Sequence, residues 1–186
     1  MIGYALCGSF CTHARSLEIL ARLRGDGYEI LPILSEITAS TDTRFGRADE
    51  LVRRVEELCG RPAVRTVRDA EPLGPAIPLD ALVICPCTGN TLAKLACGIT
   101  DTPVCMAAKA HLRSDRPLLI TLASNDALSA NLKNLGTLLC RKSVYFTPLR
   151  QDDPASKPHS LVADFDRVPD ALAAALQGIQ LRPLFL

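Results

Sequence analysis

Residues 80–101 read DALVICPCTGNTLAKLACGITD and contain, in this order, an apolar run, a polar turn and the start of a helix. The run from Ala81 to Cys85 has no polar alternation, which is typical of a strand covered on both faces of a parallel sheet. Pro86 should end this strand, because proline cannot donate to a sheet ladder. The pattern therefore predicts a central strand whose carboxyl end faces a ligand crevice.

The polar turn Thr88-Gly89-Asn90-Thr91 has two interpretations. The free N–H groups and the dipole of the following helix attract anions or the polar edge of a cofactor, and we expect Lys94 inside that first turn. Alternatively, Thr88 or Asn90 only caps the helix, since such residues are common at helix starts. The sequence leaves both interpretations open.

The composition describes a chain that can bury a core of its own. It has 186 residues, nearly half of them hydrophobic, and we expect one domain. Its formal charge of +1, with both signs interspersed, argues against binding to nucleic acid or to a membrane surface. No apolar run reaches membrane-spanning length and no signal-peptide pattern begins the chain, so we expect a cytoplasmic protein.

The eight cysteines are predicted to be free thiols. Five lie in apolar stretches, where cysteine behaves as a small hydrophobic residue: Cys7, Cys85, Cys97, Cys105 and Cys140. The pairs Cys7/Cys11 and Cys85/Cys87 lack the second pair and the histidine of a zinc site. No metal site is predicted.

The amino-terminal segment predicts a strand at Ile2–Leu6 and a helix that ends at about Gly25. The turn between them has one glycine and lacks the G-x-G-x-x-G pattern that admits a dinucleotide. Gly8, Ser9 and Thr12 could hold one phosphate through N–H and hydroxyl donors, or they could form an ordinary turn.

The rest of the chain continues the alternation of strands and helices. We predict strands at 28–34, 63–67, 117–123 and 144–147, helices at 47–59, 104–112, 131–140 and 170–176, and an ordered loop at 71–79. This order predicts an α/β fold of the Rossmann-like type, with an open, mostly parallel sheet and helices on both faces. The loops that follow its strands, with Ser35, Ser124 and Asn125, should converge on one edge.

Charged residues near these loops are candidate substrate ligands. Arg44 could meet a carboxylate with two parallel hydrogen bonds, or it could form a surface pair with Asp42. Asp101 and Asp126 could be helix caps as easily as catalysts, so no general base is predicted. His111, near a polar helix end, is expected to be solvated and receives no role.

Two turns carry a resemblance to a known family. Gly8-Ser9 and the segment from Pro86 to Thr91 resemble the signature turns of the flavoprotein family, FMN-binding Rossmann-like proteins that include cysteine-type decarboxylases. Blocks at 41–46, 71–75, 106–110 and 151–154 are similar to one branch of this family, and the resemblance runs from about residue 2 to about residue 180. The chain has no tryptophan and no histidine in 71–79, so it lacks the decarboxylases' substrate clamp and active-site histidine.

The resemblance implies one half of a two-component oxidoreductase that forms an aromatic pyridine dicarboxylate during sporulation. It implies FMN as the family's cofactor, NAD(P) held by the partner subunit, and self-association into a homo-oligomer. The residues that it assigns to the flavin-type site are Gly8, Ser9, Thr88, Gly89, Asn90 and Thr91. We add Thr12 from the first turn, and Ser35, Ser124 and Asn125 by their position at strand ends.

The leading hypothesis is that the crevice binds a dicarboxylate intermediate. Arg44, Lys94 or Lys109 would pair with a carboxylate, and Asn90 would orient the ring or the cofactor. The alternatives are an FMN-dependent oxidoreductase or decarboxylase that acts alone, and a non-catalytic scaffold subunit.

Overall fold

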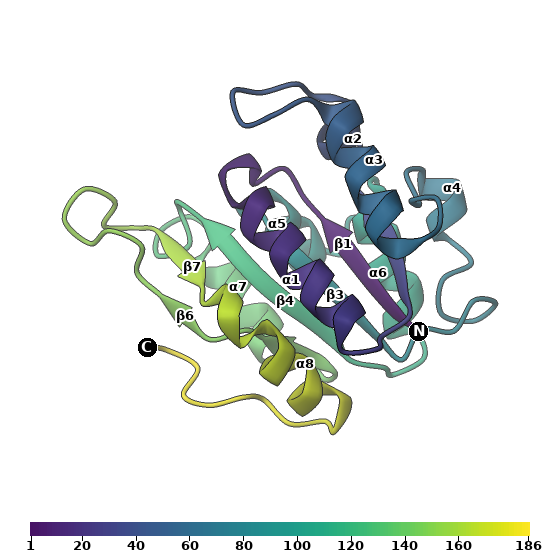
Figure 1. Ribbon diagram of the computed structural model, residues 1–186. Helices are drawn as coiled ribbons and strands as arrows, with labels where there is room; N and C mark the ends of the chain where they lie inside the picture. The colour runs from purple at the N-terminus through teal and green to yellow at the C-terminus, as the bar shows by residue number, and fades with distance from the viewer.

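The computed structural model describes all 186 residues and contains one seven-stranded sheet (Figure 1). Its strands are β1 (Ile2–Leu6), β2 (Ile30–Leu34), β3 (Ala81–Cys87), β4 (Leu118–Ser124), β5 (Val144–Phe146), β6 (Leu149–Arg150) and β7 (Leu161–Ala163). The order β2-β1-β3-β4 is parallel; β5 pairs in parallel with the first half of β4, and β7 pairs antiparallel with its end. The predicted open, mostly parallel α/β sheet is confirmed.

Helices cover both faces of this sheet. They are α1 (His13–Gly25), α2 (Glu36–Ser40), α3 (Ala48–Cys59), α4 (Val67–Ala70), α5 (Gly89–Cys97), α6 (Pro103–Leu112), α7 (Leu132–Leu139) and α8 (Val168–Leu176), with 3₁₀ turns η1 (Phe10–Thr12) and η2 (Phe165–Arg167). Residues of α1, α3 and α8 pack on one face, and residues of α4, α5, α6 and α7 pack on the other. No helix is both long and apolar enough to cross a bilayer.

Strand β3 lies at the centre, between β1 and β4, and all seven of its residues are buried. Because successive side chains point to opposite faces, Val83 joins the hydrophobic cluster under α1 and α8, whereas Leu82 and Ile84 join the cluster under α5 and α6. A strand buried on both faces has no polar alternation, which explains the apolar run in its sequence.

Strand β3 does not end at Pro86, as predicted, but continues to Cys87. The register of the β3–β4 pairing shifts between Ile84 and Cys87, so Pro86 lies at an irregularity where no ladder N–H is needed. Its carbonyl oxygen still accepts a hydrogen bond, at 3.2 Å, from the N–H of Cys7. The strand therefore carries its backbone into the polar turn.

The prediction of a strand at 63–67 is wrong. Only Val64 forms an isolated bridge, with Ile33 of β2, and Val67 already begins α4. The reason is the cap: the hydroxyl of Thr66 accepts a hydrogen bond of 3.1 Å from the N–H of Asp69, which starts a helical turn. The short elements α2, β6 and β7 are additions to the predicted set.

Two predicted environments are also wrong. His111 is completely buried, with Nε2 2.9 Å from the carbonyl oxygen of Pro117, and burial lowers its pKa from the ordinary value. Cys97 and Cys140 are exposed at the ends of α5 and α7, whereas Cys7, Cys85 and Cys105 are buried as expected. Helix ends expose their last residue even when the preceding residues form an apolar stripe.

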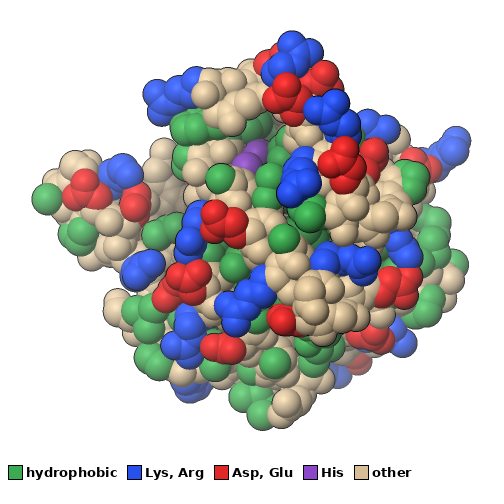
Figure 2. All heavy atoms as spheres, in the orientation of Figure 1, with side chains coloured by type: hydrophobic (Ala, Val, Ile, Leu, Met, Phe, Trp, Pro, Cys, Tyr) green, Lys and Arg blue, Asp and Glu red, His purple; other side chains and the backbone are tan.

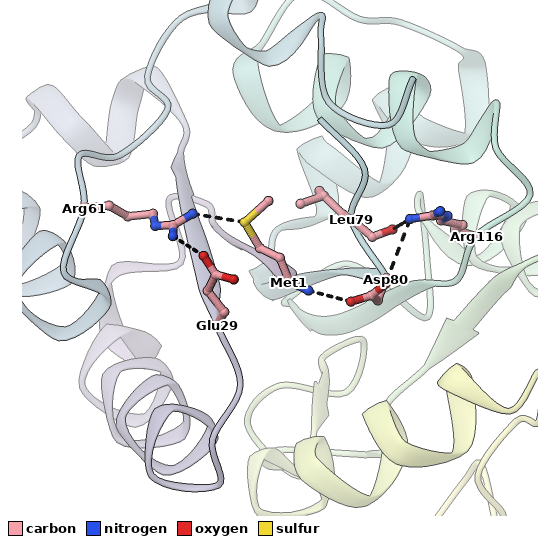
Figure 3. A network of polar contacts seen from close by, with 6 residues as sticks. All are labelled: Met1, Glu29, Arg61, Leu79, Asp80 and Arg116. Carbon is pink, nitrogen blue, oxygen red and sulfur yellow. Dashed lines mark hydrogen bonds and ion pairs between the residues drawn. The ribbon is translucent and has the colours of Figure 1, made fainter. Parts of the chain in front are cut away.

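Figure 3 shows polar contacts at the edge where the parallel strands begin. The ammonium group of Met1 lies 2.5 Å from Asp80, and Arg116 lies 4.0 Å from the same carboxylate. Nearby, Arg61 pairs with Glu29 and touches the sulfur of Met1. These contacts tie the starts of β1, β3 and β4 together, at the opposite end of the sheet from the polar turn.

The surface seen in Figure 2 carries Lys, Arg, Asp and Glu side chains intermixed, without a large patch of one sign. The loop between β6 and β7 extends away from the body (Figure 1). Two hydrogen bonds attach the base of this loop to the end of β4 and the residues after it. The N–H of Leu128 donates a hydrogen bond of 2.9 Å to the carbonyl oxygen of His159, and the hydroxyl of Ser160 donates one of 3.3 Å to the carbonyl oxygen of Ser124.

Candidate functional site

A crevice of about 480 Å³ lies at the carboxyl ends of β1, β3 and β4. Open parallel sheets bind their ligands at this edge, because the loops that follow neighbouring strands meet there. The residues that line it are Gly8, Ser9, Phe10, Cys11, Arg44, Phe45, Thr88, Gly89, Asn90, Ala123, Ser124, Asn125 and Asp126.

The structure brings most of the predicted site residues together. Eight of them line the crevice: Gly8, Ser9, Arg44, Thr88, Gly89, Asn90, Ser124 and Asn125. Five do not: Thr12, Ser35, Thr91, Lys94 and Lys109. The five other residues of the crevice are not among the predicted site residues: Phe10, Cys11, Phe45, Ala123 and Asp126.

The hydroxyl groups that lie outside the crevice are used for local structure. Thr12 donates to the carbonyl of Ser9 at 2.8 Å. Ser35 caps α2, and its hydroxyl lies 2.8 Å from that of Thr38. Thr91 donates to the sulfur of buried Cys7 at 3.3 Å. These side chains fix the turns around the crevice and leave their neighbours to face a ligand.

Neither predicted lysine reaches the crevice. Lys94 lies in the last turn of α5, not in the first turn as expected, and its Nζ is 2.7 and 2.9 Å from the two carboxylate oxygens of Asp101. This hydrogen bond raises the pKa of Lys94 and lowers the pKa of Asp101. Lys109 is exposed on α6. The structure therefore leaves Arg44 as the cation of the crevice.

The first turn of α5 presents hydrogen-bond donors to the crevice. Thr88 is the N-cap: its hydroxyl accepts from the N–H of Thr91 at 3.2 Å, and its carbonyl accepts from the N–H of Leu92 at 2.9 Å. The first two N–H groups of the helix, those of Gly89 and Asn90, have no acceptor within the helix. Such groups, with the helix dipole, favour a phosphate or a carboxylate.

A fixed carboxylate lies beside this turn. Asp126 accepts hydrogen bonds from the hydroxyl of Ser124, at 2.5 Å, and from the side-chain amide of Asn131, at 2.9 Å. Asn134 in turn donates to Asn131 at 2.8 Å. The hydrogen bond from Ser124 is the largest of the effects that lower the pKa of Asp126, so this group is ionised at neutral pH.

Gly89 is required by this cluster. A Cβ atom at this position would lie 2.7 Å from Oδ1 of Asp126 and 2.8 Å from Nδ2 of Asn131, closer than carbon can approach either atom, and it would also clash with the hydroxyl of Ser124. A glycine is thus what allows the start of α5 to lie directly against the Asp126 cluster.

Arg44 is held by an aromatic ring instead of a carboxylate. Its guanidinium carbon lies 4.9 Å from the centroid of the Phe45 ring, a cation–π contact. The alternative pair with Asp42 is not formed; Asp42 instead accepts a 2.8 Å hydrogen bond from the N–H of Ala48. Arg44 and Asp126 are the charged side chains of the crevice, and neither forms an ion pair with another residue of the chain.

The cysteines beneath the crevice are poor nucleophiles. Burial raises the pKa of Cys7 to about 12 and raises the pKa of Cys87 well above its ordinary value. Because the thiolate is the reactive form, these thiols act as core side chains. Cys11 lies at the crevice surface and is exposed.

A smaller cavity of about 270 Å³ adjoins the crevice between α1 and the start of α3. Phe10 and Phe45 line both spaces. His13 also lines the small cavity; its Nε2 lies 2.8 Å from the carbonyl oxygen of Cys7, and burial lowers its pKa. No sequence pattern points to this cavity, because its walls come from two separate segments, 10–17 and 38–54.

Comparison with known proteins gives a consistent result. The family described as Flavoprotein matches residues 2–158. The B subunit of dipicolinate synthase from Bacillus subtilis strain 168 is 43% identical over 185 residues, which cover 100% of this chain and 92% of that protein. The crystal structure of the dipicolinate synthase B subunit from Bacillus halodurans superposes with a TM-score of 0.91 at 39% identity, covering 100% of this chain and 95% of that one.

A more distant structure has the same fold. The FMN-dependent cysteine decarboxylase SpaF superposes with a TM-score of 0.67 at 24% identity, over 95% of this chain and 94% of that one. The family match covers the three strand ends that form the crevice, and the two dipicolinate synthase relatives match the whole chain. The chain therefore belongs to the flavoprotein family and, within it, is a relative of the B subunit of dipicolinate synthase.

Proposed function

We propose that the chain is the B subunit of a dipicolinate synthase. With an NAD(P)-binding A subunit, it oxidises a dihydrodipicolinate-type intermediate to dipicolinic acid during sporulation. The observation that carries this proposal is the 43% identity with a protein of that name over the full length of the chain. The crevice supports it, since a pocket with a cation and free N–H donors suits a small dicarboxylate.

In this proposal the chain's own residues bind and orient the intermediate. Arg44 pairs with one carboxylate, because its guanidinium has no protein counter-ion and is held in place by Phe45. Ser9 and the N–H groups of Gly89 and Asn90 hold a second anionic group. The first βα turn lacks the glycine pattern of a dinucleotide site, which supports placing the NAD(P) on the other subunit.

FMN is a second candidate ligand, favoured by the donors at the start of α5. The N–H groups of Gly89 and Asn90, together with the hydroxyl of Ser9, fit a phosphate in number and type, and Phe45 offers an exposed aromatic face. When bound, a flavin would supply two-electron redox chemistry. The chain's residues would hold the phosphate at the α5 turn and exclude water with Phe10 and Phe45.

The first experiment is reconstitution with the A subunit, following reduced nicotinamide by absorbance with either protein on its own and with both. We expect turnover only when both are present. Arg44→Ala should lower kcat/KM by about tenfold to a hundredfold, the value of a lost charge-assisted hydrogen bond. The matched control is Arg68→Ala, because the Arg68 side chain is 94% exposed on α4 and lies outside the crevice. Full activity of the Arg44 variant would favour a scaffold role.

The absorption spectrum separates the two ligands. The purified chain is mixed with FMN, with and without its partner, and is desalted before the visible spectrum is recorded. Retained flavin bands would support flavin binding by this chain. A colourless protein that restores dipicolinate formation would support a crevice for the dicarboxylate alone. Light scattering of the same sample tests the homo-oligomer that we also propose from the family resemblance.

A further inference from the structure

The crevice contains two opposite charges that the protein leaves unpaired. Arg44 stacks on Phe45 and makes no ion pair, and Asp126 accepts hydrogen bonds only from the neutral side chains of Ser124 and Asn131. Both line the same space. A pocket for a plain dianion would gain nothing from a carboxylate in its wall, since like charges repel. The ligand therefore has to satisfy an acceptor as well as donors.

Asp126 is fixed in position for this purpose. Each of its carboxylate oxygens accepts one hydrogen bond from the protein and keeps a further lone pair for another donor. The supports are themselves held: Ser160 donates to the carbonyl of Ser124, and Asn134 donates to Asn131. An acceptor that is already oriented loses little entropy when a ligand binds.

The donors of the crevice come from two sides. Arg44 belongs to the loop between α2 and α3, whereas the free N–H groups of Gly89 and Asn90 belong to the start of α5, next to Asp126. Two elements that recognise anions thus share a pocket with one fixed acceptor. In kind, this set suits a ligand with two carboxylates for the donors and one ring N–H for the acceptor.

We propose that Asp126 makes the crevice selective for a ring whose nitrogen carries a hydrogen, with Arg44 and the α5 turn holding the flanking carboxylates. The choice of a cyclic diacid rests on the proposed function. In the reduced ring, the nitrogen carries a hydrogen as the protonated imine or as the enamine tautomer, and this N–H donates to Asp126. In the aromatic pyridine, the nitrogen presents a lone pair to the carboxylate, which is repulsive. Asp126 thus favours the substrate over the oxidised product and promotes product release.

Calorimetry with three diacids of similar shape tests this assignment. Piperidine-2,6-dicarboxylate carries a protonated ring nitrogen, pyridine-2,6-dicarboxylate carries a lone pair, and benzene-1,3-dicarboxylate carries a C–H. Each is titrated into the purified chain and into its complex with the A subunit. We expect the piperidine to bind about tenfold or more tightly than the other two, as for a charge-assisted hydrogen bond.

Two variants separate the roles. Asp126→Asn should reduce the preference to within about twofold, because a rotated amide can still accept from Asn131 and donate to Ser124 but carries no charge. Arg44→Gln should weaken all three ligands together and keep the preference. Thermal melting checks that both variants fold, and the comparison of ligands on the unaltered chain needs no variant.

Three results would overturn the proposal: equal affinity of the unaltered chain for the three diacids, an undiminished preference in Asp126→Asn, or no binding of any diacid to either sample. The outcome is distinct from that of the reconstitution experiment. Turnover in the reconstituted pair without a ligand preference would reject the role of Asp126 alone, whereas a clear preference without turnover would reject the synthase assignment and keep the site.

Discussion

Replacing Gly89 with alanine tests whether the start of α5 lies against the Asp126 cluster. The added methyl group would lie 2.7 Å from Oδ1 of Asp126 and 2.8 Å from Nδ2 of Asn131, so these side chains or the helix must shift. Overpacking of this kind costs about 1–3 kcal/mol, and the better helix propensity of alanine returns part of it. We expect a net loss of about 1–2 kcal/mol in the free energy of unfolding.

Gly136→Ala is the matched control. Gly136 lies inside α7, is exposed, and has no atom within 4 Å of the added methyl position. Alanine there should stabilise the protein by about 0.5–1 kcal/mol, since glycine is a poor helix residue. Urea unfolding of both variants gives the two free energies with one method. A Gly89→Ala variant as stable as the unaltered chain would refute the close approach of α5 to Asp126.

Buried and paired groups elsewhere in the chain give three further expectations. His111 has a lowered pKa in the folded chain, so its contribution to stability is complete above the unfolded pKa of about 6.5 and is lost as the pH falls below that value. Between pH 8 and about 5, the urea midpoint of the unaltered chain should therefore fall more steeply than that of His111→Gln. Tyr4→Phe removes the 2.8 Å hydrogen bond to the carbonyl of Ser16 and should cost about 1 kcal/mol, again by urea unfolding. Lys94→Met should change the affinity for the piperidine diacid by less than about twofold, because Lys94 pairs with Asp101 outside the crevice. A larger loss of affinity, measured by calorimetry, would contradict that placement.

The sequence predicts the parts of the fold that depend on strong local patterns. Strands β1, β3 and β4 are buried on both faces, and such strands must read as apolar runs. The end of α3 is predictable from Gly60, which adopts the left-handed conformation with φ of 67°. The two-residue strand β6 and three-residue strand β7 are too short to produce a periodic signal, and their pairing depends on distant β4.

For the site, the position of a residue at a strand end predicts its place in the crevice, whereas the direction of a helical side chain cannot be predicted from the sequence. Ser9, Thr88 and Ser124 follow neighbouring parallel strands, and the topology alone brings them together. Lys94 lies outside the crevice because the direction of a helical side chain depends on its rotation about the axis and on a partner, here Asp101, that lies beyond the helix.

The role of Asp126 depends on contacts that no local pattern records. Its supports, Asn131 and Asn134, lie at the start of the next helix, and its neighbour Gly89 lies 37 residues earlier in the chain. One signal is present in the sequence: of two asparagines three residues apart at a helix start, the second can hydrogen-bond to the first, and the first can hydrogen-bond to a carboxylate at the preceding strand end. A glycine at the first position of a helix is a second such signal, since it permits close approach.

The sheet divides the hydrophobic core into two clusters, one under α1, α3 and α8 and the other under α4 to α7. The fixed carboxylate of the crevice accepts its hydrogen bonds from the end of β4 and the start of α7, which packs on the second cluster. Substitutions under α8 should therefore combine additively with changes at the crevice, because the strands lie between them. For evolution, this means that homologues can vary the residues of α8 and of its outer surface while the residues around Asp126, on the opposite face of the sheet, stay the same.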